Sequence, residues 1–306
     1  MAAYYKILRP LNLVIVTLTQ GLLFFIIHSA YQKAGVLPIL DGPLITLFII
    51  CTLCLAASAN VINDILDIDI DLHNKRKNIV GSAITRKQAY LYYSLITLIG
   101  LILAAYIGVE IGRPGLILIY PVAAMVLYFY SKSFKGMPLL GNLVVAAFCA
   151  FVPGILWYGE LDALHLLKSK DLIGYEVITY LLSGFVIFSF MTNLVRELVK
   201  DIEDYPGDKI HGIRTYPVAY GIPRARVFAL FNMMMTLLIV VFWWYSGRDL
   251  YSGSRIHSLA IAPLIFPPLV IINHLTKIPD LIRVRLASYW LKVYMVIGLL
   301  ILLILA

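Results

Sequence analysis

Residues 42–71 read GPLITLFIICTLCLAASANVINDILDIDID, an apolar stretch that runs directly into a cluster of aspartates. A transmembrane helix needs about 20 predominantly apolar residues, so 42–62 is long enough to cross a bilayer. Asp64, Asp67 and Asp71 are spaced i, i+3 and i+7, which places them within about 60° of one another on a helix. The stretch therefore predicts a membrane-spanning helix that ends in a face of carboxylates.

Eight further apolar stretches have the same character. Hydrophobic residues make up 61% of the chain and charged residues 14%, and the mean hydropathy is +0.89, whereas soluble domains are about 45–50% apolar and about 25% charged. We expect an all-α integral membrane protein that forms a single domain over 1–306. Its nine predicted transmembrane helices cover residues 11–29, 42–62, 89–110, 115–130, 139–158, 177–195, 227–246, 258–275 and 286–305.

Lysine and arginine lie mostly on one side of this predicted topology. If the N-terminus is inside, the inside segments hold 19 of the 25 Lys and Arg residues. Cytoplasmic loops are enriched in these residues, so the N-terminus and the acidic cluster are predicted to face the cytoplasm from a multi-pass protein of the cell (inner) membrane. The net charge of +8 then meets anionic headgroups and phosphates. The net charge therefore does not indicate a nucleic-acid partner, and nothing in the sequence implies a protein partner.

The acidic cluster occurs twice. Residues 201–208 read DIEDYPGD, and Asp201, Asp204 and Asp208 repeat the spacing of the first copy, 64–71, at a constant offset of 137 residues. The offset suggests an internal duplication.

Each copy begins a long, charged connection, over 65–88 and 197–225, which we expect to form cytoplasmic cap loops. We expect Pro206 and Gly207 to break the helix near Asp204, so that Asp208 would lie in a turn. Glu203 lies off the shared face and is interpreted as solvated or structural.

The two acidic copies favour chemistry on a diphosphate. Carboxylates stacked on one face repel each other unless a cation lies among them. Mg²⁺ usually binds through a few carboxylates together with substrate phosphates. Basic residues follow each copy, and cations of this kind bind anionic oxygens. The sequence therefore predicts an enzyme that acts on a diphosphate at a membrane.

Four stretches together resemble the UbiA superfamily of intramembrane prenyltransferases. They are LRPLN (8–12), NDILDIDID (63–71), YSKSFK…LLGN (130–142) and KDIEDYPGDKIHGIRTYPVAYG (200–221). The superfamily pattern N-D-x-x-D-x-x-x-D is matched by residues 63–71, and its D-x-x-x-D by Asp204 to Asp208. The resemblance covers essentially the whole chain. It implies nine helices around a central cavity and Mg²⁺-dependent transfer of an isoprenyl group from its diphosphate to an acceptor, with release of pyrophosphate.

The resemblance also assigns roles to residues. The expected metal ligands, which are also catalytic, are Asn63, Asp64, Asp67, Asp71, Asp201, Asp204 and Asp208. Tyr130 is expected near the departing oxygen. The diphosphate is expected to contact Lys75, Lys77, Lys132, Lys135 and Lys200, although Lys200 could equally extend to the headgroups. The acceptor is expected near Arg9 and Asn12, although Asn12 could instead tie two helices together.

The identity of the acceptor rests on motif spelling. KDIEDYPGD and GIRTYPV are most similar to the digeranylgeranylglyceryl phosphate synthase branch, which attaches a C20 prenyl chain to the free hydroxyl of a prenylated glycerol phosphate. One departure is the run NKRKNIVGSAI (74–84), where many relatives have N-K-P-x-R-P. The alternative is an aromatic acceptor of the hydroxybenzoate or naphthoate type, as in quinone biosynthesis. A cation transporter and a non-catalytic lipid-binding relative are remoter hypotheses.

Overall fold

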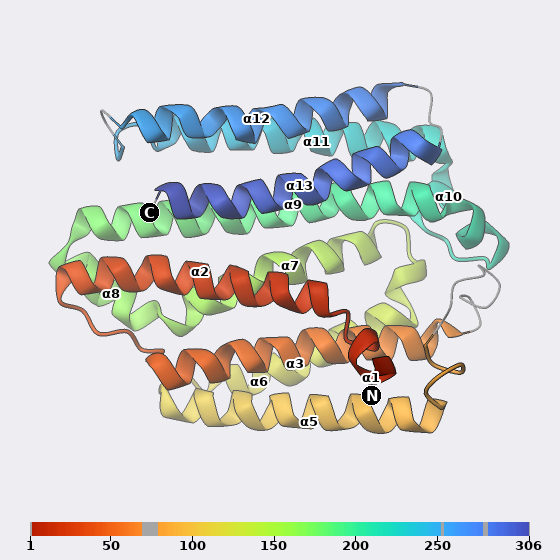
Figure 1. Cartoon of the computed structure of the whole chain (residues 1–306), viewed down its shortest axis with the longest axis horizontal. Coiled ribbons are helices and arrows are strands. Elements are labelled where there is room, and N and C mark those ends of the chain that lie inside the picture. Colours follow the sequence, from red (N-terminus) through yellow and green to blue (C-terminus); the bar gives the residue numbers. More distant parts are fainter. Residues whose placement is uncertain (1, 69–78, 252–253, 278–280, 306) are drawn as a thin grey trace. The chain divides into compact units, whose positions relative to one another are not determined.

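The computed structural model describes residues 2–68, 79–251, 254–277 and 281–305, and these are almost entirely α-helical (Figure 1). Within these ranges nine helices are long and apolar enough to cross a membrane, which confirms the predicted fold class and all nine spans. They are α2 (Pro10–Ala34), α3 (Gly42–Leu66), α5 (Arg86–Glu110), α6 (Gly115–Lys132), α7 (Leu140–Gly159), α9 (Leu172–Ile210), α11 (Ile222–Ser246), α12 (Arg255–Thr276) and α13 (Leu281–Leu305).

Four short helical segments connect these spans and were not predicted. They are α1 (Ala2–Ile7), the 3₁₀ turn η1 (Phe134–Gly136), α8 (Leu161–Lys170) and α10 (Tyr216–Tyr220). Segments of one to three turns carry too few residues for a hydrophobic period to be read from the sequence. Two neighbours of the acidic motifs come from these segments: Lys135 lies in η1, and Thr215 is the N-cap of α10.

The long helices expose large apolar side chains along their length. On α5, for example, Leu98, Ile102 and Val109 are 52%, 59% and 72% exposed. Such apolar surface is expected on helices that face hydrocarbon.

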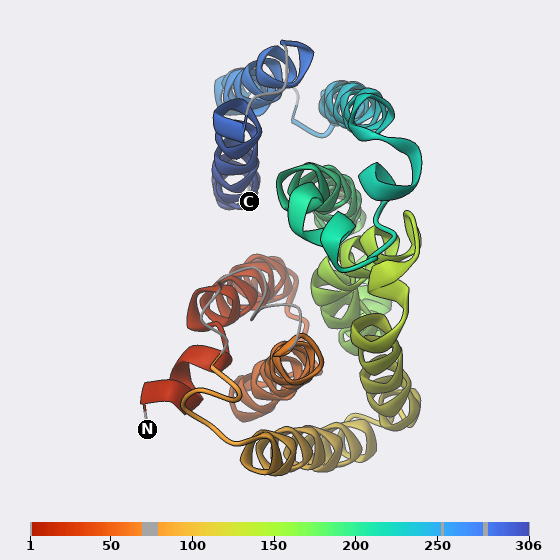
Figure 2. The same cartoon turned by 90° about the vertical axis from the view of Figure 1, so that its right-hand side faces the viewer.

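The chain forms two compact units. The first comprises Met1–Gly21 and Leu37–Lys135, and the second comprises Leu22–Val36 and Gly136–Ala306. In the first unit α3, α5 and α6 pack against one another, and α1 contacts α3. In the second, α9 packs against α7, α8, α10, α11 and α13; the end-on view in Figure 2 shows α9 (green) with α7 (yellow-green), α11 (teal) and α13 (dark blue) beside it. Each unit contains one acidic motif. The single domain over 1–306 stays a prediction.

Local interactions fix where α3 begins and ends. The Asp41 side chain caps its N-terminus and accepts a hydrogen bond from the Leu44 N–H at 3.1 Å. The C-cap is Asp67, whose N–H donates to the carbonyl of Asn63 at 2.9 Å. Asn63 and Asp64 of the first acidic motif therefore lie in the last turn of α3, and Asp67 is its cap.

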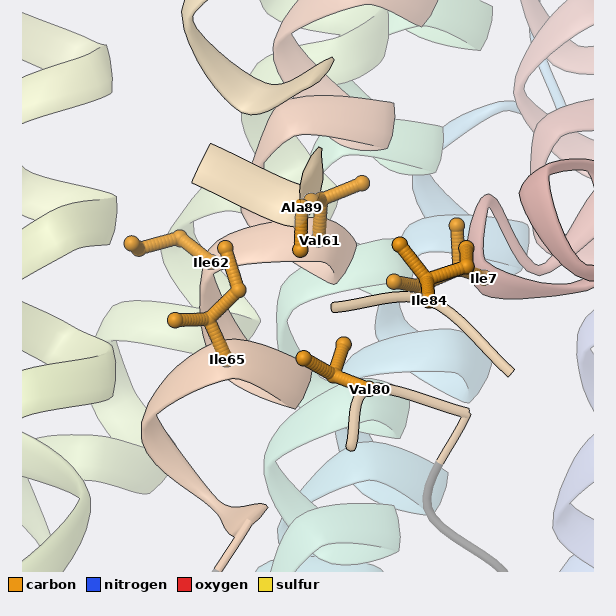
Figure 3. Close-up of a cluster of buried hydrophobic side chains, with 7 residues drawn as sticks. All are labelled: Ile7, Val61, Ile62, Ile65, Val80, Ile84 and Ala89. Atoms are coloured by element: carbon orange, nitrogen blue, oxygen red, sulfur yellow. The ribbon is translucent and has the colours of Figure 1, made fainter. Parts of the chain in front are cut away.

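A hydrophobic cluster anchors this end of α3. It joins α3 to α1, to residues 79–84 and to the first turn of α5, which begins with a capping box between Thr85 and Gln88. Figure 3 shows the buried members: Ile7, Val61, Ile62, Ile65, Val80, Ile84 and Ala89. The packing holds the final turn of α3, and hence the motif, in a defined position.

The helix α9 is longer than expected and corrects one prediction. It runs without a break from Leu172 to Ile210, with Pro206 and Gly207 inside it. A proline removes one intrahelical donor; here only the carbonyl of Ile202 loses its helical partner, close to the end of the helix, and the helix continues. Asp208 therefore lies on the helix and not in a turn. The predicted connection over 197–225 is wrong for the same reason, because its first half is helical.

Candidate functional site

The first acidic motif presents two carboxylates at the end of α3, and each already contacts a cation. The guanidinium Nη2 of Arg9 lies 2.8 Å from Asp64 Oδ1. The ammonium group of Lys135 contacts Asp67 Oδ2, and Asn63 Nδ2 donates to the same oxygen at 2.8 Å. Asp67 is buried, with 6% of its surface exposed. The expected repulsion between the carboxylates is thus relieved by two cations brought from distant segments.

Both cations come from strained or tight pieces of chain. Arg9 connects α1 to α2 with φ of 54°, a left-handed conformation that is uncommon for residues other than glycine. Its N–H donates to the carbonyl of Lys6 at 3.1 Å, and its own carbonyl accepts from Asn12 N–H at 2.9 Å. Lys135 lies in the 3₁₀ turn η1, directly after α6. These two turns direct the cations to the motif.

The second acidic motif lies on the last three turns of α9, and uncharged polar groups hold it. Asn142 Nδ2, in the first turn of α7, donates to Asp201 Oδ2 at 2.7 Å. The hydroxyl of Thr215, the N-cap of α10, donates to Asp208 Oδ2 at 3.2 Å. Asp204, which lies between these two residues in the sequence, is half-buried. The two anchored carboxylates are seven residues apart, so they lie on the same face of the helix.

Glu203 lies off this face and has a structural partner. Its Oε1 accepts from Arg285 Nε at 3.2 Å, which ties α9 to α13. This agrees with the interpretation of Glu203 as a residue outside the metal-binding set.

The remaining predicted site residues differ in exposure, and three of them lie outside the described part of the chain. Lys132 is exposed, and its ammonium lies 5.9 Å from the centre of the Tyr128 ring. Tyr130 is half-buried on α6, whereas Asn12 and Lys200 are exposed. Asp71, Lys75 and Lys77 lie outside the described residues.

Three residues at the motifs were not predicted: Asn142, Thr215 and Glu197. Asn142 and Thr215 fall in the stretches that carry the family resemblance, but nothing in the sequence indicates their contacts with α9. Glu197 lies one turn before Asp201, is 6% exposed, and its Oε1 is 2.7 Å from Arg196 Nη1. Glu197 and Asp201 are spaced i and i+4 and so share a helix face, which is the feature of the sequence that could have predicted its place beside the motif.

The donors fit a hard cation, and their number limits how it is held. Carboxylate and amide oxygens are the ligands that Mg²⁺ prefers, and at α3 positively charged groups already occupy positions beside them. Among the described residues no three His, Cys, Asp or Glu side chains form a group that could hold a metal ion. A magnesium ion at either motif would therefore need further oxygen ligands, which a substrate diphosphate can provide.

Comparison with known proteins agrees with this fold. Residues 22–277 match the UbiA prenyltransferase family. The digeranylgeranylglyceryl phosphate synthase of Pyrococcus horikoshii is 32% identical over 77% of this chain and 75% of its own length. That of Korarchaeum cryptofilum is 31% identical over 98% and 95%, respectively.

Two solved structures share the fold. A digeranylgeranylglyceryl phosphate synthase structure superposes with a TM-score of 0.67 at 23% identity, over 99% of this chain and 96% of that one. A UbiA homologue from Archaeoglobus fulgidus bound to GPP and Mg²⁺ superposes with a TM-score of 0.55 at 17% identity, over 98% and 99%. With the match over residues 22–277 and nine apolar helices in its described part, this chain belongs to the UbiA prenyltransferase family and is a multi-pass membrane prenyltransferase.

Proposed function

We propose that this prenyltransferase transfers a geranylgeranyl group from its diphosphate to the hydroxyl of a prenylated glycerol phosphate and releases pyrophosphate. The donor and acceptor are inferred from relatives that bear the name digeranylgeranylglyceryl phosphate synthase, one of them 31% identical over 98% of the chain. The structural observation that best supports diphosphate chemistry is Asp67, a buried carboxylate held between Asn63 and Lys135 at the end of a membrane helix.

Mg²⁺ is the proposed cofactor, in keeping with the hard oxygen donors at both motifs and with the related Archaeoglobus fulgidus structure that holds GPP and Mg²⁺. When bound, it neutralises charge on the diphosphate and so makes the diphosphate a better leaving group. Asn63, Asp64, Asp67 and Asp71 would hold one ion at the first motif. Asp201, Asp204 and Asp208 would hold a second ion at the other motif.

The cations at the first motif have a second proposed role. Arg9 and Lys135 compensate Asp64 and Asp67 in the structure. With a metal ion on these carboxylates, Arg9 and Lys135 would be available for anionic oxygens of the substrates. We assign Lys135 to the diphosphate and Arg9, with Asn12, to the phosphate of the acceptor.

The remaining basic and aromatic residues complete the proposal. Lys75, Lys77, Lys132 and Lys200 are assigned to the diphosphate, and Tyr130 to the oxygen that departs. Both motifs are proposed to face the cytoplasm, where charged substrate headgroups are met while the prenyl chains stay in the bilayer.

A competition assay tests this function. Purified protein in nanodiscs receives Mg²⁺, labelled geranylgeranyl diphosphate and an equimolar mixture of geranylgeranylglyceryl phosphate and hydroxybenzoate. We expect label in the ether lipid alone, and none with Asp67→Asn or after chelation of the metal. Efficient prenylation of hydroxybenzoate, with the glycerol phosphate neither consumed nor inhibitory, would replace the ether-lipid assignment by the aromatic one.

A further inference from the structure

Glu197 extends the acidic face of α9 toward the apolar part of the helix. Positions 197, 201, 204 and 208 fall within about 60° of one another around a helix, so four carboxylates share one face. Glu197 comes directly after the apolar span 177–195. It lies about 6 Å before Asp201 along the helix axis, and so further from the C-terminal end of α9. It is 6% exposed. The face therefore carries one buried carboxylate beyond the set proposed for metal.

The first motif has no carboxylate at the corresponding position. At the offset of 137 residues, Glu197 corresponds to Asn60. Asn60 Nδ2 donates at 3.0 Å to the backbone carbonyl of Leu8, which ties α3 to the segment that carries Arg9. The extra carboxylate is thus a property of the second motif alone. A metal-binding role shared by both motifs does not account for this difference.

The surroundings of Glu197 suit a carboxylate that works inside the protein. The Arg196 guanidinium, 2.7 Å away, compensates its charge and so offsets part of the cost of burial. One turn deeper, Asn193 is 2% exposed and donates to the carbonyl of Ser189 at 2.8 Å. Polar groups on α9 thus continue beyond Glu197 into the membrane-spanning part of the helix.

The reaction itself requires a proton acceptor at this depth. The substrate that receives the prenyl group is an alcohol in the proposed function, and an alcohol keeps its proton until the new bond forms. A diphosphate held at Asp201–Asp208 has its prenyl chain in the bilayer, so its reacting carbon lies on the bilayer side of the carboxylates that hold it. That is the side on which Glu197 lies.

The geometry points to Glu197 as the general base that takes the hydroxyl proton of the acceptor, an inference that rests on the proposed function. As the acceptor oxygen bonds to C1 of the prenyl group, the bond from C1 to the diphosphate oxygen breaks, and its electron pair leaves with the diphosphate. The hydroxyl proton passes to the Glu197 carboxylate and then to solvent. Proton transfer by a positioned side chain contributes about 10²–10⁴-fold to a rate.

Positional isotope exchange separates this role from metal binding. In geranylgeranyl diphosphate labelled with ¹⁸O at the bridging position, the label moves to a non-bridging position when the C1–O bond breaks and re-forms. For Glu197→Gln we expect product formation to fall by about 10²–10⁴-fold, while Mg²⁺-dependent exchange, measured with an acceptor analogue that lacks the hydroxyl, stays within a few-fold of the wild type. Asp201→Asn should lose both. Glu203→Gln, which alters the carboxylate paired with Arg285 on another face, is the matched control and should keep both.

An acceptor analogue with a thiol in place of the hydroxyl provides an independent test of the general-base role. A thiol ionises far more readily than an alcohol, so the defect of Glu197→Gln should shrink at least about tenfold with the thiol if its cause is a missing base. Near-normal product from the variant, or an equal loss of product and exchange with no relief by the thiol, would overturn the assignment.

The same series tests the acceptor separately. If the wild type consumes only an aromatic acceptor, the proposed function fails, and the role of Glu197 is then decided with that acceptor in the exchange assay. Size-exclusion profiles and thermal unfolding in detergent show whether each variant is folded.

Discussion

The guanidinium of Arg9 lies 2.8 Å from the carboxylate of Asp64, although the two residues are 55 positions apart in the chain. Arg9 makes this contact from a left-handed backbone conformation, with φ of 54°. A non-glycine residue held in this conformation costs about 1–3 kcal/mol, and strain of this kind tends to persist at functional sites. The contact therefore links backbone strain to the acidic motif.

The strain predicts an unusual order of stabilities at position 9. Arg9→Gly and Arg9→Ala both lose the ion pair, which is worth less than about 1 kcal/mol because Arg9 is partly exposed. Only glycine also relieves the strain, so Arg9→Gly should be more stable than Arg9→Ala by about 1 kcal/mol. Thermal unfolding in detergent measures the difference. Activity should fall in both variants, and an alanine variant as stable as the glycine variant would show that the backbone is not strained.

Lys135 and Asp67 should be energetically coupled. Asp67 is buried, and removal of one partner of a buried ion pair leaves an uncompensated charge, at a cost of about 3–5 kcal/mol. We expect the single variants Lys135→Met and Asp67→Asn to be less stable than the double variant that carries both substitutions. A double-mutant cycle by chemical or thermal unfolding measures the coupling, and additive losses would contradict it. The double variant should still be inactive, because it lacks both a proposed metal ligand and a proposed diphosphate contact.

The acidic faces could be predicted from the sequence because they depend on local geometry. Asp64 and Asp67 lie on one turn of helix, and the apolar run before them defines the membrane span. Their partners could not be predicted, since Arg9 and Lys135 are 55 and 68 positions away and are brought to the motif by a strained residue and a 3₁₀ turn. Positive charge beside the carboxylates was expected, but its source depends on tertiary packing.

The prediction at Pro206 failed for a related reason. A proline disfavours the helix in general, but the loss of one hydrogen bond near the end of a 39-residue helix does not outweigh the packing of that helix against its neighbours. The local rule was applied without knowledge of this packing.

Pro206→Ala tests the continuity of α9 directly. Alanine restores the N–H that can pair with the carbonyl of Ile202 and removes the clash of the proline ring, so stability should rise by about 1 kcal/mol. Activity should stay within about twofold of the wild type, because Asp204 and Asp208 keep their positions on the helix. A large loss of activity without a loss of stability would show that the motif requires a break at this point.

Asn142 should matter to catalysis through its contact with Asp201. Its amide donates to the carboxylate at 2.7 Å, and a hydrogen bond to a charged group is worth about 1.5–3 kcal/mol. Asn142→Ala should therefore lower product formation by about 10–100-fold. Asn232→Ala is the matched control: Asn232 is equally buried, but its amide donates to the carbonyl of Phe228 within α11, so activity should persist. Equal losses in the two variants would indicate a general effect of a buried asparagine.

The orientation of the acidic motifs can be measured at the two ends of α9. This helix is long and apolar enough to cross the membrane, so Ser169 before it and Arg214 after it are expected on opposite sides, and both are exposed. In a variant without Cys51, Cys54 and Cys149, Arg214→Cys should react with an impermeant thiol reagent in inside-out vesicles. Ser169→Cys should react only in right-side-out vesicles. This expectation follows from the excess of Lys and Arg on the side where the sequence predicts both motifs, and the reverse labelling pattern would place the chemistry outside the cytoplasm.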